Sequence, residues 1–294
     1  MNTIRVKSKS LLLLAALTTS SSAVNFLTPG ADLDVAANWE GGAFPQSGEQ
    51  GLVEINAAWP NTSGGGTLSV FGDLIIGSTT ATNITLTAAV DIVGANPSSV
   101  VFNNVTVNVM DDIFTGGGTG NFIFNPGSVT TVADDFEANG GGTITINGGT
   151  HSLAGTVNTS NVGAQNNSTL NFLGGTVTTD VFRTQQNGLG TVFGTINLGG
   201  DATITSDSID FASAGIVDVS SDWTGSITAT NTLTDFEDIF VDLVLLDGTV
   251  LDATAFDENF QISEDGLTLS LIPEPSAALL GMMGILTLLR RRRL

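Results

Sequence analysis

Short runs of alternating apolar and polar residues recur along the central part of the chain, and each run closes on a Gly, Asn or Pro turn. The runs are VFNNV ending near Asn104, FIFNPGS at Pro126, ITINGGT at Gly148, LNFLGGT at Gly174 and INLGGD at Gly199. The turns therefore recur at a nearly constant spacing. Alternation with a period of two, bounded by turn residues, indicates half-buried β-strands.

A second element interleaves with the first and consists of an acidic residue followed by apolar residues. It begins at Asp73, Asp91, Asp112, Asp135, Asp180 and Asp210, with Asn158 in the same place between Asp135 and Asp180. Two elements that share one period predict a stack of similar units that bury each other's apolar faces. We therefore predict an all-β fold, a right-handed parallel β-helix (β-solenoid) over residues 67–234. A β-sandwich is the alternative, because spaced short strands fit it as well.

The segment before the repeats, residues 24–66, breaks the period and predicts an irregular cap. It contains Trp39, Gly41, Gly42, Pro45 and Gly48 in the pattern W-x-G-G-x-x-P-x-x-G. This pattern resembles the N-terminal segment of autotransporter-like β-solenoid proteins. The resemblance implies a cover over the first coil, which would otherwise expose an unpaired strand edge.

The segment after the repeats, residues 235–272, also departs from the period. Its sequence is rich in apolar residues and includes a turn at Asp247-Gly248 and a second turn at Glu264-Asp265-Gly266. Acid-Gly pairs between apolar runs are typical of tight hairpin turns. We expect this segment to form a closing cap that ends in a hairpin.

Residues 1–23 have the layout of a secretory signal peptide. Arg5, Lys7 and Lys9 precede the apolar run 11–17, and small residues lead up to Ala23. A basic start, a short apolar run and a small-residue site are the three parts that a signal peptidase recognises. We predict export of the chain and cleavage after Ala23.

Residues 273–294 form a second targeting segment. Pro273, Glu274 and Pro275 are followed by the uncharged run 276–289 and then by Arg290, Arg291, Arg292 and Arg293. As a helix the uncharged run spans about 21 Å, shorter than a hydrocarbon core of roughly 30 Å. Local thinning of the bilayer, snorkelling arginines and Leu294 would allow it to cross, and the arginines are then expected on the cytoplasmic side. We expect one short transmembrane helix that halts export in the inner membrane.

This tail resembles the PEP-CTERM sorting signal, which consists of Pro-Glu-Pro, a short transmembrane stretch and an Arg cluster in that order. The resemblance covers only residues 273–294. It implies processing near Pro273 by an exosortase, a membrane protease or transpeptidase of Gram-negative bacteria that make extracellular polysaccharide. It therefore implies passage through the inner membrane to the cell surface or extracellular matrix, but it identifies a route and no activity.

The body between the two targeting segments is strongly acidic. Of the 29 acidic residues in the chain, all but Glu274 lie in residues 24–272, where Arg183 is the one basic residue, and the chain has no Cys. This charge excludes nucleic acid as a partner, because binding of phosphates needs Lys or Arg. Recurrent Val, Ile, Leu and Phe also distinguish the body from disordered acidic chains.

Two acidic pairs stand one period apart and are the candidate metal site. Asp111 and Asp112 form the first pair, and Asp134 and Asp135 form the second. In a solenoid such pairs stack about 4.8 Å apart, and at about 5 Å two unit charges repel by about 3 kcal/mol at an effective dielectric of 20. Ca²⁺ between the carboxylates relieves this repulsion. The alternative is four solvated corner residues screened by water and salt.

The inventory of catalytic side chains in the body is small. His151 follows a turn, and we expect it at the surface; we expect Arg183 to pair with Asp180 or with an acid of the neighbouring coil. A lyase on a β-helix usually needs a basic residue and several cations, so a single Arg argues strongly against that class, whereas a hydrolase needs only two carboxylates. Trp39, Trp59 and Trp223 are expected in buried positions of the caps, with stacking on sugar rings as the alternative.

These patterns predict a structural or adhesin-like protein of the cell surface that associates with exopolysaccharide or biofilm, and no enzyme. No cofactor is expected apart from Ca²⁺. The expected partners are the exosortase, the polysaccharide and, transiently, the inner membrane. A β-helix polysaccharide hydrolase and a non-catalytic carbohydrate-binding protein are the alternatives.

Overall fold

A computed structural model describes the chain in residues 23–27, 36–43, 50–53, 58–59, 68–70, 73–78, 84–88, 92–94, 99–115, 120–158, 168–184, 194–210, 216–230 and 244–272. The segment upstream of Ala23, predicted to be a signal peptide, lies outside the described residues. So do the predicted sorting motif at Pro273, Glu274 and Pro275, the predicted transmembrane helix, and the cluster of Arg290, Arg291, Arg292 and Arg293.

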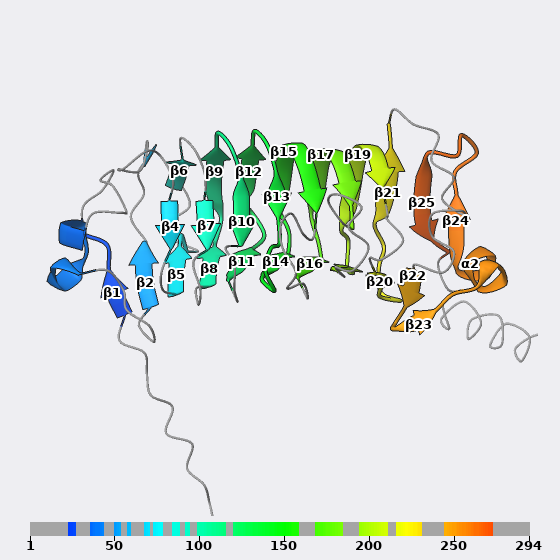
Figure 1. Ribbon diagram of the computed structural model, residues 1–294, viewed down its shortest axis with the longest axis horizontal. Helices are drawn as coiled ribbons and strands as arrows, with labels where there is room; N and C mark the ends of the chain where they lie inside the picture. Colours follow the sequence, from blue (N-terminus) through cyan, green and yellow to red (C-terminus); the bar gives the residue numbers. More distant parts are fainter. Residues whose placement is uncertain are drawn as a thin grey trace, which may run out of the picture.

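The first face of the molecule is an eleven-stranded sheet along its long axis (Figure 1). Its strands, in order, are β1 (Ala23–Asn25), β2 (Gln50–Val53), β5 (Asp73–Ile76), β8 (Ser99–Phe102), β11 (Asn121–Phe124), β14 (Thr143–Ile146), β16 (Thr169–Phe172), β18 (Thr195–Leu198), β20 (Ile216–Val219), β22 (Val244–Leu246) and β23 (Thr249–Val250). Every neighbouring pair from β1 to β22 is parallel, and only β23 returns antiparallel.

The second and third faces belong to a fourteen-stranded sheet. The second face runs through β3 (Ala58–Trp59), β6 (Ile84–Ala88), β9 (Val105–Val109), β12 (Val129–Val132), the first halves of β15 (Thr150–Asn158), β17 (Thr176–Arg183) and β19 (Thr203–Asp210), and β21 (Ser226–Ala229). The third face runs through β4 (Leu68–Val70), β7 (Ile92–Gly94), β10 (Ile113–Thr115), β13 (Phe136–Glu137) and the second halves of β15, β17 and β19.

The predicted parallel β-solenoid is confirmed, and the β-sandwich alternative is wrong. Each strand pairs in parallel with the strand one coil on, as Asn121 does with Ser99 and with Thr143. Sandwich sheets are antiparallel. The five runs that defined the repeat contribute β8, β11, β14, β16 and β18, which follow one another on the first face. The right hand of the helix stays a prediction, consistent with the general rule for parallel crossovers.

The second repeat element mixes positions from different faces. Asp73 begins β5 on the first face, where it pairs with Ser99. Asn158 pairs with Glu137, two positions beyond Asp135, so its assignment to the same place was wrong. Asp91 lies outside the described residues. Asp73 and Asn158 were assigned to the wrong place because an acidic or amide residue before an apolar strand occurs at more than one corner of the coil.

The core consists of apolar side chains that stack from coil to coil in the space enclosed by the three faces. The four-residue strands of the first face bury alternate side chains, and Phe102, Phe124 and Phe172 are among those fully enclosed. The rings of Phe102 and Phe124 stack with centroids 4.7 Å apart. Each coil places an apolar side chain over a similar one in the coil before it. The core is therefore built from contacts between neighbouring coils.

Asparagine side chains form a ladder at the corner between the first and second faces. Asn125 Nδ2 donates to Asn103 Oδ1 at 2.6 Å, and Asn147 Nδ2 donates to Asn125 Oδ1 at 2.9 Å. Asn104 follows with φ 57°, a left-handed conformation that Asn tolerates better than most residues. The Asn and Gly turns of the sequence therefore provide both the sharp bend and the bonds between coils.

Caps close both ends. At the N-terminus two short 3₁₀ helices, η1 (Ala36–Asn38) and η2 (Glu40–Gly42), flank Trp39, which is buried edge-to-face against Phe26 with ring centroids 5.0 Å apart. β2 and β3 already pair in parallel with β5 and β6, so coil stacking extends upstream of residue 67.

At the C-terminus the two predicted turns are confirmed. Asp247 and Gly248, both with positive φ, connect the antiparallel pair β22 and β23. Helix α2 (Ala253–Asn259) follows, capped by Asp252, whose carboxylate accepts from the N–H of Ala255. The hairpin of β24 (Phe260–Ile262) and β25 (Thr268–Leu271) then adds antiparallel to β21 and ends the second face.

Candidate functional site

The two acidic pairs lie over one another at the corner between the second and third faces. Asp111 and Asp112 connect β9 to β10, and Asp134 and Asp135 connect β12 to β13 one coil on. The N–H of Asp134 donates to the carbonyl of Asp111 at 3.2 Å, and the N–H of Ile113 donates to the carbonyl of Asp135 at 3.0 Å. The pairs are stacked as the period predicted.

The second acid of each pair binds the backbone of the next coil. Asp112 Oδ1 accepts from the N–H of Asp135 at 2.8 Å, and Asp135 Oδ1 accepts from the N–H of Thr156 at 2.8 Å. Carboxylates at a sharp corner thus satisfy N–H groups that the β-ladder leaves without a partner. This structural role was not apparent from the sequence, because it depends on which residue of the next coil lies opposite.

Carboxylate oxygens from three of these four residues converge. Asp111, Asp112 and Asp134 each bring one oxygen within 4.8 Å of the others. Burial raises the pKa of Asp112 to about 6, with the charges of Asp111, Asp134 and Asp135 adding to the rise and the hydrogen bond from Asp135 opposing it. Burial, and then Asp135 and Asp111, also raise the pKa of Asp134. The oxygens suit a hard cation such as Ca²⁺, which takes six to eight oxygen ligands, so water would complete the shell.

The position of His151 corrects the sequence interpretation. It was expected at the surface, but it is buried in β15, with its ring edge-to-face against Phe124 at 5.4 Å. Its Nε2 lies 3.1 Å from the carbonyl oxygen of Gly148, and among the described residues its Nδ1 has no hydrogen-bond partner. Burial lowers the pKa of His151, partly offset by the Gly148 contact. The neutral imidazole is therefore a core group.

Arg183 lies at the third face. Its Nη2 donates to Thr156 Oγ1 at 3.0 Å, and its backbone pairs with Asp210 of the next coil. Asp180, the other partner that the sequence offered, lies three residues earlier on β17 and is exposed. The structural role predicted for Arg183 is thus consistent with its contact to the neighbouring coil, although the described partner is a hydroxyl.

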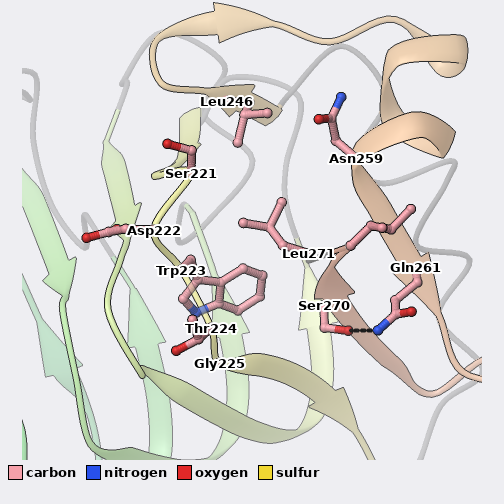
Figure 2. Close-up of a pocket in the computed structure, with 11 residues that line it drawn as sticks. Ser221, Asp222, Trp223, Thr224, Gly225, Leu246, Asn259, Gln261, Ser270 and Leu271 are labelled. Atoms are coloured by element: carbon pink, nitrogen blue, oxygen red, sulfur yellow. Dashed lines mark hydrogen bonds between the residues drawn. The ribbon is translucent and has the colours of Figure 1, made fainter. Parts of the chain in front are cut away.

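A groove of about 510 Å³ lies between the last coil and the C-terminal cap (Figure 2). Its walls come from four elements: the corner that connects β20 to β21, the end of β22, the end of α2, and the hairpin of β24 and β25. The lining residues are Ser221, Asp222, Trp223, Thr224, Gly225, Leu246, Asn259, Gln261, Ser270, Leu271 and Ile272. Gln261 Nε2 donates to Ser270 Oγ at 3.0 Å and orients the amide at one wall.

The groove combines an apolar floor with hydroxyl and amide groups. Trp223 is buried and donates from Nε1 to the carbonyl of Ala202 at 2.8 Å, so the indole supports the floor with little of its ring face open. Asp222 is the one carboxylate among the lining residues, whereas glycoside hydrolysis uses two. Trp39 and Trp223 are buried as predicted, and the side chain of Trp59 lies outside the described residues.

Comparison of the chain with protein-family models, with curated proteins and with solved structures finds no match. Within the described ranges the structure contains no helix with the length and apolar character needed to cross a bilayer. The residues that bear on function are therefore those of the two ends of the chain and those that shape the body.

Proposed function

We propose that the chain is an exported structural or adhesin-like protein of the cell surface or extracellular matrix, processed by an exosortase and associated with exopolysaccharide. The observation that carries this proposal is the tail, in which Pro-Glu-Pro, an apolar run and four arginines follow one another. In this scheme the arginines hold a temporary anchor on the cytoplasmic side of the inner membrane while the protease acts near Pro273.

The arrangement of the body supports both processing steps. β1 begins at Ala23, and Val24 pairs with Gly51, so cleavage after Ala23 removes only the first residue of this strand. β25 ends at Leu271, two residues before Pro273, so cleavage near the motif leaves the last hairpin whole. A protease at the membrane thus has a cleavage site next to a finished fold.

The experiment is replacement of Pro273, Glu274 and Pro275 by alanine in the producing cell, followed by fractionation of membrane, cell surface and medium. The proposal predicts that the wild-type chain reaches the surface or the medium and that the variant accumulates in the inner membrane. A variant with the wild-type distribution would contradict processing at this motif. A His151→Val variant made in parallel controls for effects of substitution as such.

Carbohydrate binding is the second candidate, and the groove at the C-terminal cap favours it. Amide and hydroxyl groups of Asn259, Gln261 and Ser270 surround an apolar floor, as in sites that orient a sugar through a few polar contacts. A glycan array probed with the purified chain and with Gln261→Ala tests it. Binding that depends on Gln261 supports this site, and binding unaffected by the substitution removes it.

Ca²⁺ at Asp111, Asp112 and Asp134 belongs to the same proposal as a weak structural ion. The convergent oxygens and the raised pKa of Asp112 support it, since a cation would relieve the charge repulsion that contributes to that rise. Calorimetric titration with millimolar Ca²⁺ tests it, with the Asp111→Asn variant as the comparison. If the wild-type chain gives no heat of binding, the proposal that Ca²⁺ binds at these carboxylates is wrong.

A further inference from the structure

The outward side chains of the second face form two straight columns. One column contains Thr85, Thr106, Val129, Thr150, Thr176, Thr203 and Ser226, and the other contains Thr87, Asn108, Thr131, Ser152, Thr178, Thr205 and Thr228. Most of these positions are threonine, and each strand contributes one pair in a T-x-T arrangement or a close variant of it. The register is unbroken from β6 to β21, so the pairs lie directly over one another.

The central part of this face, from β12 to β17, is open to solvent, and its hydroxyl groups are free to bind water. Val129 is 44% exposed, and Thr131, Thr150, Ser152, Thr176 and Thr178 are also exposed. Among the described residues, none of these five hydroxyls makes a hydrogen bond within the protein. A β-branched side chain on a strand has few χ1 states, so the hydroxyl and methyl groups hold fixed positions.

The same face is free of charge, although the body holds all but one of the 29 acidic residues of the chain. Neither column includes a charged or an aromatic side chain, and exposed acids near the columns, among them Asp134, Asp180, Asp201 and Asp207, lie at the two rims of the face. An acidic protein gains solubility from charges spread over its surface, so a wide neutral face needs another explanation. Absence of aromatic rings from the columns argues against a sugar platform, because such rings supply most of the contact area for stacking.

The spacing of the columns matches that of ice. Strands repeat about every 4.8 Å along the solenoid, and residues i and i+2 lie about 6.6 to 7 Å apart across the face. For tetrahedral water with oxygens about 2.75 Å apart, geometry gives second neighbours at about 4.5 Å and a repeat of about 7.3 Å along the hexagonal axis. Both spacings of the threonine array thus agree with the ice lattice to within about a tenth.

We propose that the second face, from Thr106 to Thr205, binds ice. Water held between the fixed hydroxyls adopts positions that continue into the crystal, while the Thr methyl groups occupy the hollows between them. A neutral face suits this ligand, because a charged side chain would orient its own hydration shell against the lattice. This function is separate from processing of the tail and from the groove at the C-terminal cap.

The test uses the purified full chain and two lysine variants. Thr178→Lys places a long charged side chain in the middle of the array, and Thr169→Lys places the same side chain on the first face, at an outward but less exposed position of β16. The measurements are inhibition of ice recrystallisation and enrichment of the chain in a slowly grown ice crystal. Thermal unfolding of all three proteins establishes that the folds are intact.

The proposal predicts activity of the wild-type chain, loss of at least about tenfold in potency for Thr178→Lys, and little change for Thr169→Lys, since substitutions at the centre of an interface dominate its energy. Three outcomes would overturn it: wild-type behaviour equal to that of serum albumin, equal effects of the two lysines, or binding of an insoluble neutral polysaccharide that Thr178→Lys abolishes while ice assays stay unchanged. The last result would make the face a glycan-binding surface.

Discussion

The substitution Asp112→Asn tests whether the negative charge of Asp112 destabilises the folded chain. Burial and the charges of three nearby carboxylates disfavour the ionised form of Asp112 and raise its pKa from 3.8 to about 6. At neutral pH the group is nevertheless ionised, at a cost in stability. Two pKa units correspond to about 3 kcal/mol, and because the carboxyl is partly open to water, screening leaves about 1 kcal/mol. Asn retains an oxygen for the N–H of Asp135 and carries no charge. We expect Asp112→Asn to be about as stable as wild type or up to about 1 kcal/mol more stable at pH 7.

The dependence on pH identifies the cause. The pKa of Asp112 is higher in the folded chain than in the unfolded chain, so the folded chain binds the proton first as the pH falls below about 6. Wild type therefore gains stability relative to the variant between about pH 6 and pH 4, and the advantage of Asn disappears. Other titrating groups, His151 included, are common to both proteins and cancel in the comparison.

Urea denaturation of both proteins at pH 7 and at pH 4.5 measures this difference. Asp112→Ala is the matched control, because it removes the charge and also the acceptor, and the N–H of Asp135 is left without this partner. We expect that control to be less stable than Asp112→Asn by about 1 to 2 kcal/mol. A gap between wild type and Asp112→Asn that is the same at both pH values would refute the reasoning, as would a variant that is clearly less stable at pH 7.

Three further predictions follow from the core and the corner. The pKa of His151 is lower in the folded chain than its ordinary value of 6.5, so wild type loses stability relative to His151→Val as the pH falls below about 6.5, which chemical denaturation at pH 7.5 and pH 5 would detect. Phe124→Ala removes a ring that stacks on Phe102 and contacts His151, and it should cost about 3 to 5 kcal/mol in the same assay; a loss below about 1 kcal/mol would contradict the described packing. If Ca²⁺ binds at the corner, about 5 mM of the ion raises the unfolding temperature of wild type more than that of Asp111→Asn, because a ligand stabilises only the state that binds it.

The solenoid was predictable because two independent local signals share one period. Alternation marks the strands and Gly or Asn marks the corners, and both are properties of consecutive residues. The face on which each run of the second element lies was harder to predict from the sequence. Asp73 and Asp112 precede similar apolar runs, and only the pairing of whole coils shows that they occupy different faces.

The alternation of polar and apolar residues in β15 would have predicted that His151 is buried. Thr150 and Ser152 point outward and Leu153 inward, so the residue between the two hydroxyls must face the core. The residue type, and its place after a turn, led to the opposite expectation. By contrast, the bonds from Asp112 and Asp135 to the backbone of the next coil depend on an exact neighbour one coil away, which no local pattern specifies.

The most direct test of the central claim, export followed by processing at the tail, is the intact mass of the protein recovered from the envelope and medium of the producing cell. The account predicts a chain that starts at Val24 and ends near Pro273 to Pro275, with or without an added group. A mass that still includes Arg290 to Leu294 would contradict processing and would make the tail a permanent membrane anchor.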